Sequence, residues 1–108
     1  MSRIKDLEDL LDATPDDPFI IYALAREHEA QSNTMQAVLM YEYLVTHHPA
    51  YIATYYHYSK LLYEAGNRTQ AIKLLKEGIE QGIKEKDMHS VGEMKSLLAL
   101  WTGDEDDE

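Results

Sequence analysis

Apolar residues recur along this chain at intervals of three and four, in six segments separated by short polar or proline-containing stretches. Such spacing places the apolar side chains on one face of an α-helix, which has 3.6 residues per turn. The segments cover about residues 3–13, 18–31, 34–47, 52–65, 68–81 and 87–101. Helices this short are marginal alone in water, so the pattern predicts an all-α protein whose successive helices bury their apolar faces against one another.

Most of the expected helices begin and end at ordinary signals. The candidate N-caps are Ser2, Asp17, Asn33, Asn67 and Asp87, and the stop signals are Thr14–Pro15, Pro49, Gly66, Gly82 and Gly103. Asp17 precedes Pro18, and proline is well tolerated at the first helical position, where its missing amide would be unpaired anyway. Asn33 and Asn67 are each followed by glutamine three residues later, which predicts a capping box at both positions.

A repeat of 34 residues runs through the chain. The segment N-T-M-Q-A-V at 33–38 returns as N-R-T-Q-A-I at 67–72. Apolar positions match in the same register: Ile4, Val38 and Ile72; Leu7, Tyr41 and Leu75; Leu10, Leu44 and Gly78; Leu11, Val45 and Ile79; Pro15, Pro49 and Ile83. A fixed period of this size is typical of arrays of helix pairs in which each pair buries its apolar face only against its neighbours.

This pattern resembles the tetratricopeptide repeat, a helix-turn-helix unit of 34 residues. The matching residues are Ile21, Leu24, Ala25, His28, Ala37, Tyr41, Leu44 and Pro49 in a first repeat, then Tyr55, Tyr58, Ser59, Leu62, Ala71, Leu75, Gly78 and Ile83 in a second. The resemblance implies a short right-handed superhelical solenoid in a single domain, residues 1–103. Its repeats would span about 18–51 and 52–85, with the helix at 3–13 as the second half of a preceding repeat.

The last amphipathic segment, 87–101, is expected to cap the array. Met88, Val91, Leu98 and Trp101 form its apolar stripe, whereas Gly92 and Glu93 stand where a third repeat requires a large and a small apolar residue. A capping helix covers the last core and presents polar residues to water. Beyond it, the acidic run at 104–108 cannot bury apolar surface, so we expect it to be disordered.

Composition agrees with a small globular domain and disfavours several classes of partner. The 108 residues are 44% hydrophobic and 28% charged, and without cysteine the chain has no disulfides and no thiolate metal site. The net charge is −10, or −5 without the acidic run, and basic residues form no cluster, so nucleic acids and anionic membranes are poor partners. No stretch of about 18 apolar residues occurs and the N-terminus is polar, so a cytoplasmic protein is expected.

The residues that could carry chemistry are not arranged as known sites. Five histidines occur without His-x-x-x-His or His-Glu-x-x-His spacing, so no metal site is expected. Nucleophile elbows and glycine-rich phosphate loops are also absent from the sequence, and Gly66, Gly82 and Gly103 stand at expected helix ends instead. We expect neither catalysis nor a cofactor.

The resemblance implies a binding groove lined by the first helix of each repeat. The corresponding positions hold Phe19, Tyr22, Arg26 and Glu29, then Ala53, Tyr56, Lys60 and Tyr63. We take Phe19, Tyr22, Arg26, Tyr56, Lys60 and Tyr63 as candidate contacts, because rigid aromatic rings beside cations suit a peptide that carries a carboxylate. They could also be ordinary exposed residues of amphipathic helices. The family's clamp for acidic chaperone tails requires Lys and Asn where this chain has Tyr22 and Arg26, so that ligand is not expected.

Three modes of interaction remain open from the sequence. The leading hypothesis is an adaptor that holds a peptide or helix of another protein between the helices near 18–31 and 52–65. Alternatively, the two terminal helices could complete a repeat between copies and give a head-to-tail oligomer, although a monomer is expected over a homo-oligomer. In a third mode, a partner would dock on the outer side of the helices.

Overall fold

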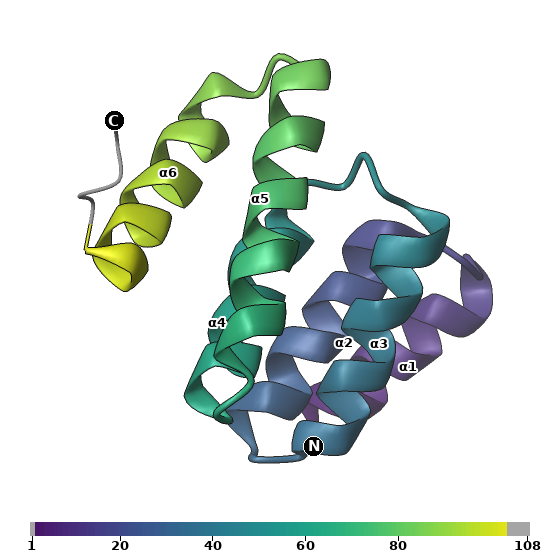
Figure 1. Ribbon diagram of the computed structural model, residues 1–108. Helices are drawn as coiled ribbons and strands as arrows, with labels where there is room; N and C mark the ends of the chain where they lie inside the picture. Colours follow the sequence, from purple (N-terminus) through teal and green to yellow (C-terminus); the bar gives the residue numbers. More distant parts are fainter. Residues whose placement is uncertain (1, 104–108) are drawn as a thin grey trace. The chain divides into compact units, whose positions relative to one another are not determined.

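The computed structural model describes residues 2–103, and within that range the chain consists of α-helices joined by short turns (Figure 1). The helices are α1 (Arg3–Ala13), α2 (Pro18–Ala30), α3 (Thr34–His47), α4 (Ala53–Glu64), α5 (Arg68–Lys84) and α6 (Met88–Thr102). No strand occurs in the described range, which confirms the all-α prediction. The acidic run at 104–108 lies outside the described residues, so the prediction of disorder there stays a prediction.

Three helix starts are capped as the sequence predicts. Ser2 Oγ accepts a hydrogen bond from the Lys5 amide at 3.2 Å, and Asp17 Oδ1 accepts one from the Phe19 amide at 2.9 Å. Asp87 accepts from the Ser90 amide at 3.3 Å, and its second oxygen accepts from the Ser90 hydroxyl at 2.7 Å. Each cap satisfies a backbone donor that the first helical turn leaves without an intrahelical partner.

Asn33 and Asn67 stand at the N-cap positions of α3 and α5, as predicted, but the two predicted capping boxes and one predicted helix stop are wrong. Neither asparagine forms a capping hydrogen bond through its side chain. The side-chain nitrogen Nδ2 of Asn33 lies 3.1 Å from Nδ1 of His28, so this side chain bonds to the preceding helix instead. Gly82 does not end α5, which continues to Lys84, and it is buried within the helix against Val91.

The helices form two compact units that divide between Tyr51 and Ile52. Unit 1 contains α1, α2 and α3, and unit 2 contains α4, α5 and α6. In unit 1, α2 packs against both α1 and α3; in unit 2, α5 packs against both α4 and α6 (Figure 1). Each central helix therefore covers the apolar faces of two neighbours.

Unit 1 has its core where the repeat pattern predicts it. The buried residues are Leu7 of α1, Ile20, Ile21, Leu24, Ala25 and His28 of α2, and Ala37, Tyr41 and Leu44 of α3. Burial of a side chain as large as Leu or Ile contributes about 1.5–3 kcal/mol, so these contacts outweigh the weak helix propensity of each short segment. Leu10 belongs to the predicted stripe of α1 but is 53% exposed, which corrects that assignment.

Unit 2 replaces a large residue by glycine at one core position. Tyr55 and Gly78 stand 34 residues after Ile21 and Leu44 of unit 1. A Cβ atom at Gly78 would lie 2.4 Å from the Tyr55 Cβ, so only glycine allows α4 and α5 to approach this closely. The Tyr55 side chain, 2% exposed, thus fills space that the absent Gly78 side chain leaves open.

The apolar face of α6 differs in part from its predicted stripe. Val91 is buried as expected and Leu98 and Trp101 are half-buried, but Met88 is 59% exposed. Met94, which the stripe omitted, is 1% exposed and contacts α5 at Gly78 and Gly82. Met88 is therefore wrongly placed in the core by the sequence pattern, and Met94 takes that role.

Candidate partner-binding surface

On α2, the four predicted groove positions differ in how far they are already engaged within unit 1. Phe19 is 64% exposed, whereas Tyr22 packs against Tyr51 with ring centroids 5.5 Å apart. Arg26 Nη1 lies 3.1 Å from Glu29 Oε1. Phe19 is consequently the most accessible of the four.

Glu29 links α2 to α3. Its Oε1 accepts a hydrogen bond of 2.7 Å from the Tyr41 hydroxyl in addition to its ion pair with Arg26. Burial, together with this bond to the carboxylate, raises the pKa of Tyr41. The charge of Arg26 is thus partly neutralised within unit 1, which reduces its capacity to bind a partner's carboxylate.

On α4, Tyr56 and Lys60 form a pair one turn apart. The Lys60 ammonium lies 5.5 Å from the centroid of the Tyr56 ring, within the range of a cation–π contact. The neighbouring His57 meets the Tyr56 ring edge-on at 5.3 Å. Both predicted residues are half-buried. The Tyr56 ring is therefore held between Lys60 and His57.

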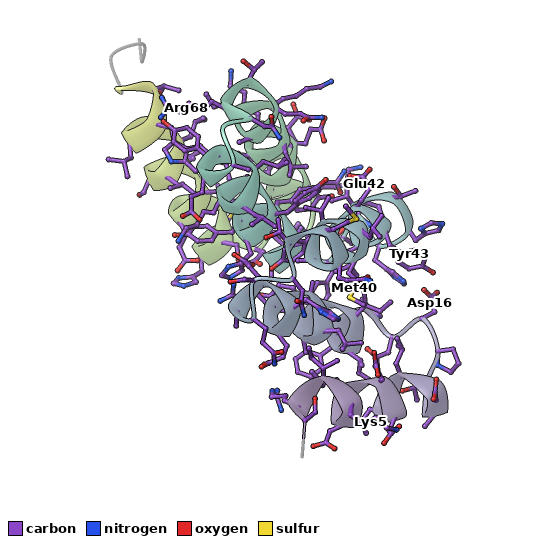
Figure 2. All side chains as sticks on the ribbon, turned by 90° about the horizontal axis from the view of Figure 1, so that it is seen from below. Lys5, Asp16, Met40, Glu42, Tyr43 and Arg68 are labelled. Atoms are coloured by element: carbon purple, nitrogen blue, oxygen red, sulfur yellow. The ribbon has the colours of Figure 1, made fainter. Side chains whose placement is uncertain are left out.

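Tyr63 belongs to a stack that joins the three helices of unit 2. Its ring lies parallel to Trp101 of α6, with centroids 4.1 Å apart and an interplanar angle of 8°. The Arg68 guanidinium at the start of α5 lies 4.9 Å from the same ring. Figure 2 labels Arg68 beside the end of α6. Tyr63 therefore has a packing role, in addition to the contact role that the sequence assigns to it.

A cleft opens between the starts of α4 and α6. Its volume is about 260 Å³, and it is lined by Ile52, Ala53, Tyr56 and His57 on one side and by Ser90, Glu93 and Met94 on the other. Met94 and Ile52 supply apolar surface, while His57, Ser90 and Glu93 supply hydrogen-bonding groups. The cleft can therefore accommodate an apolar side chain with a polar neighbour.

The sequence indicated only part of this cleft. Ala53 and Tyr56 stand at expected groove positions, but Ser90 and Glu93 were not among the candidates because α6 was interpreted as a cap. The start of α6 falls where the 34-residue period places the first helix of a third repeat. That position in the period could have identified Ser90 and Glu93 as candidates. The structure brings Tyr56 and Lys60 together in unit 2, and Phe19, Tyr22 and Arg26 lie on unit 1.

Residues 2–103 contain no group of three or more His, Asp or Glu side chains placed to hold a metal ion. None of the helices in this range is both long and apolar enough to cross a membrane.

Solved structures of tetratricopeptide repeat domains are similar to this chain. A tetratricopeptide repeat domain protein from Salinibacter ruber is 34% identical in its crystal structure, with a TM-score of 0.78 over 82% of this chain and 98% of that chain. A solution NMR structure, also of a tetratricopeptide repeat domain protein from Salinibacter ruber, gives 34% identity and a TM-score of 0.79 over 87% of this chain and 95% of that chain.

A more distant likeness extends over nearly the whole chain. The solution structure of a Bordetella parapertussis protein gives a TM-score of 0.81 at 17% identity, over 96% of this chain and 90% of that chain, which shows a shared fold alone. No protein-family model and no curated protein matches the sequence. The 34% identity to the Salinibacter ruber domain, over nearly all of that domain, confirms the predicted resemblance, and this chain belongs to the tetratricopeptide repeat family.

Proposed function

We propose that this chain is a non-catalytic interaction module that binds a segment of a partner protein on the first helix of each repeat. The observation that supports this function best is the cleft between α4 and α6, which has Tyr56 in its wall and Met94 at its base. A buried apolar base with an aromatic wall is typical of pockets that receive an anchor side chain at protein interfaces.

The groups around the cleft define the chemistry of the proposed ligand. An apolar side chain of the partner enters the cleft and packs against Tyr56, whose ring offers a large contact area at a small entropic cost. Lys60, held near that ring, is placed to bind a carboxylate next to the apolar side chain. The proposed ligand is a peptide or helix with an apolar anchor and an adjacent Asp, Glu or C-terminus.

The candidate residues of unit 1 are considered separately from the cleft. Phe19 is the main contact there because its ring is largely exposed. Tyr22 acts mainly by packing against Tyr51, and Arg26 by its pairing with Glu29. We therefore expect substitution of Tyr22 to reduce stability as well as binding, which makes Tyr56 the cleaner position for a test.

The test is capture of partners from extracts of the native host by the immobilised chain, followed by mass spectrometry and measurement of affinity for the captured protein. Tyr56→Ala should weaken binding by at least about tenfold, since loss of an interface aromatic costs about 2 kcal/mol or more. Its helical circular dichroism should match that of the unmodified chain, because Tyr56 is only half-buried.

Ile83→Ala is the matched control, since Ile83 lies on α5 in unit 2, is 49% exposed and does not line the cleft. A partner that uses the cleft should bind this variant with unchanged affinity. Equal binding of the partner to Tyr56→Ala and the unmodified chain would refute the proposed site.

A further inference from the structure

A second apolar groove lies in unit 1, between α1 and α3. Its apolar surface comes from Leu11 of α1, Pro15 of the following turn, Ile21 of α2, and Leu39, Met40 and Tyr43 of α3. Its volume is about 430 Å³. Figure 2 shows Met40 and Tyr43 on α3 beside Asp16 of the turn. We call this surface the α1–α3 groove; it shares no residue with the cleft of unit 2.

The groove continues into an exposed apolar stripe on α3. Met35 is 78% exposed, Leu39 60% and Tyr43 38%, and these residues follow one another at intervals of four. Side chains at this spacing are neighbours on one helix face, so the exposure is contiguous along two turns of α3. Contiguous exposed apolar surface with a polar rim is characteristic of sites where another protein docks.

The rim of the groove is negatively charged. Asp12 and Asp16 line it, and Asp16 Oδ1 accepts hydrogen bonds from the Tyr43 hydroxyl at 2.5 Å and from Nε2 of His48 at 2.9 Å. His47 stacks on the Tyr43 ring at 4.1 Å. The bonds from Tyr43 and His48 hold the Asp16 carboxylate at the rim and lower its pKa, so it remains ionised near neutral pH.

The arginines and lysines of unit 1 are engaged away from the groove. Arg3 pairs with Glu27 at 3.4 Å, Lys5 with Asp9 at 2.8 Å and Arg26 with Glu29 at 3.1 Å. Residues 1–51 carry nine Asp or Glu and three Lys or Arg, a formal charge of −6. The groove therefore combines an apolar floor with a rim that attracts cations.

We propose that the α1–α3 groove binds an amphipathic helix of a partner protein that presents Leu-like side chains flanked by Lys or Arg. The apolar side chains pack against Leu39, Met40 and Leu11, and a basic side chain bonds to Asp16 or Asp12. A helix fits because Met35, Leu39 and Tyr43 expose apolar surface along two turns of α3, and a partner helix can pack along that face. An anionic membrane or a second copy of this acidic unit would be repelled by the same rim.

The test uses two synthetic helical peptides of equal length. Both carry leucines on one face, and the other face carries lysines in the first peptide and glutamates in the second. The lysine peptide should bind the full chain with an affinity that falls as salt is raised, and the glutamate peptide should not bind. Leu39→Lys should weaken binding of the lysine peptide at least tenfold.

Leu100→Lys is the matched control for charge and exposure. Leu100 lies on α6 in unit 2, is 76% exposed, and its substitution adds the same single charge. It should change the affinity for the lysine peptide less than twofold. Equal losses in Leu39→Lys and Leu100→Lys would show attraction to net charge alone and would overturn the proposal.

Further measurements distinguish the proposed helix from other occupants of the groove, and binding in the groove from binding in the cleft. Tyr56→Ala should leave binding of the lysine peptide unchanged, so the two surfaces can fail independently. Binding to phosphatidylserine-containing vesicles that is lost in Leu39→Lys would assign the groove to a membrane and overturn the proposal. Self-association that is lost in Leu39→Lys would assign it to a second copy, with the same consequence.

Discussion

Two glycines in unit 2 have opposite surroundings, and substitution should separate close packing from helix propensity. A Cβ at Gly78 would lie 2.7 Å from the Tyr55 Cγ and 2.9 Å from the Met94 Sδ, whereas a Cβ at Gly92 meets nothing within 4 Å. Both positions are helical. The same change, Gly to Ala, is therefore strained at one position and unobstructed at the other.

Gly78→Ala should lower the free energy of unfolding by about 1–3 kcal/mol, because Tyr55 Cβ is fixed to the backbone and cannot move aside. Gly92→Ala should raise it by about 0.5–1 kcal/mol, since alanine loses less entropy on forming a helix. Urea denaturation followed by circular dichroism measures both. Changes of the same sign in the two variants would contradict the close α4–α5 approach.

Burial of Tyr55 predicts a loss of stability at high pH. Burial raises the pKa of Tyr55 to about 12 from its ordinary 10.0. Between these values the unfolded chain releases the phenolic proton while the folded chain retains it, so stability is complete below pH 10 and falls as pH rises. The slope from one such group approaches about 1.4 kcal/mol per pH unit.

Denaturation of the unmodified chain and of Tyr55→Phe between pH 9 and 12 isolates this effect from that of the other tyrosines. The free energy of unfolding should fall less steeply with pH in Tyr55→Phe. Identical slopes would show that the Tyr55 hydroxyl is not responsible.

At the residue scale, the sequence predicted positions where one side chain acts on its own helix. Ser2, Asp17 and Asp87 cap their helices because the relevant amide lies two or three residues away. Asn33 also stands at an N-cap position, but its side chain bonds to His28 on the preceding helix instead of capping α3. The ion pair of Arg26 and Glu29 joins residues one turn apart, whereas the bond from Tyr41 to Glu29 joins residues 12 apart on two helices, a contact that helix spacing does not predict.

The end of α6 is attached to unit 2 by the stack of Trp101, Tyr63 and Arg68. Trp101→Ala should lower the free energy of unfolding by about 1–3 kcal/mol. This loss is smaller than that expected on truncation of a fully buried Trp, because Trp101 is only half-buried. The near-ultraviolet circular dichroism should lose intensity with the stacked pair. Leu100→Ala, at a position 76% exposed, should change stability by less than about 0.5 kcal/mol. Equal effects in the two variants would contradict an anchoring role for the stack.

At the element scale, the 3.6-residue period located every helix in the described range because each has one apolar face. Helix boundaries were less predictable at glycine, which can either end a helix or allow close packing inside one. Gly82 was read as a stop signal, but it lies inside α5 because Val91 packs where its side chain would be. Met94 was missed although it lies on the same helical face as Val91, Leu98 and Trp101. Ser90 and Glu93 of the cleft were missed because α6 was interpreted as a cap.

For the whole molecule, the 34-residue period predicted the family and the all-α class, but the partner is not encoded in helix periodicity. The terminal helices expose apolar residues, among them Leu10 on α1 and Leu100 on α6, which is the feature a head-to-tail oligomer would use. A net charge of −10 opposes association of identical chains.

We therefore predict a monomer of 12.5 kDa in sedimentation velocity from about 10 µM to 1 mM, the range of weak association. The Leu100→Lys variant should sediment as the unmodified chain does. Growth of larger species with concentration, abolished by this substitution, would favour the head-to-tail oligomer instead.

Hydrogen–deuterium exchange of the chain, with and without its captured partner, tests the proposed interaction most directly. Binding in the cleft should slow exchange in residues 53–64 and 88–102, the helices that line it, and this protection should be absent with Tyr56→Ala. Protection confined to α1 and α3, or unchanged by Tyr56→Ala, would contradict partner binding at the α4–α6 cleft.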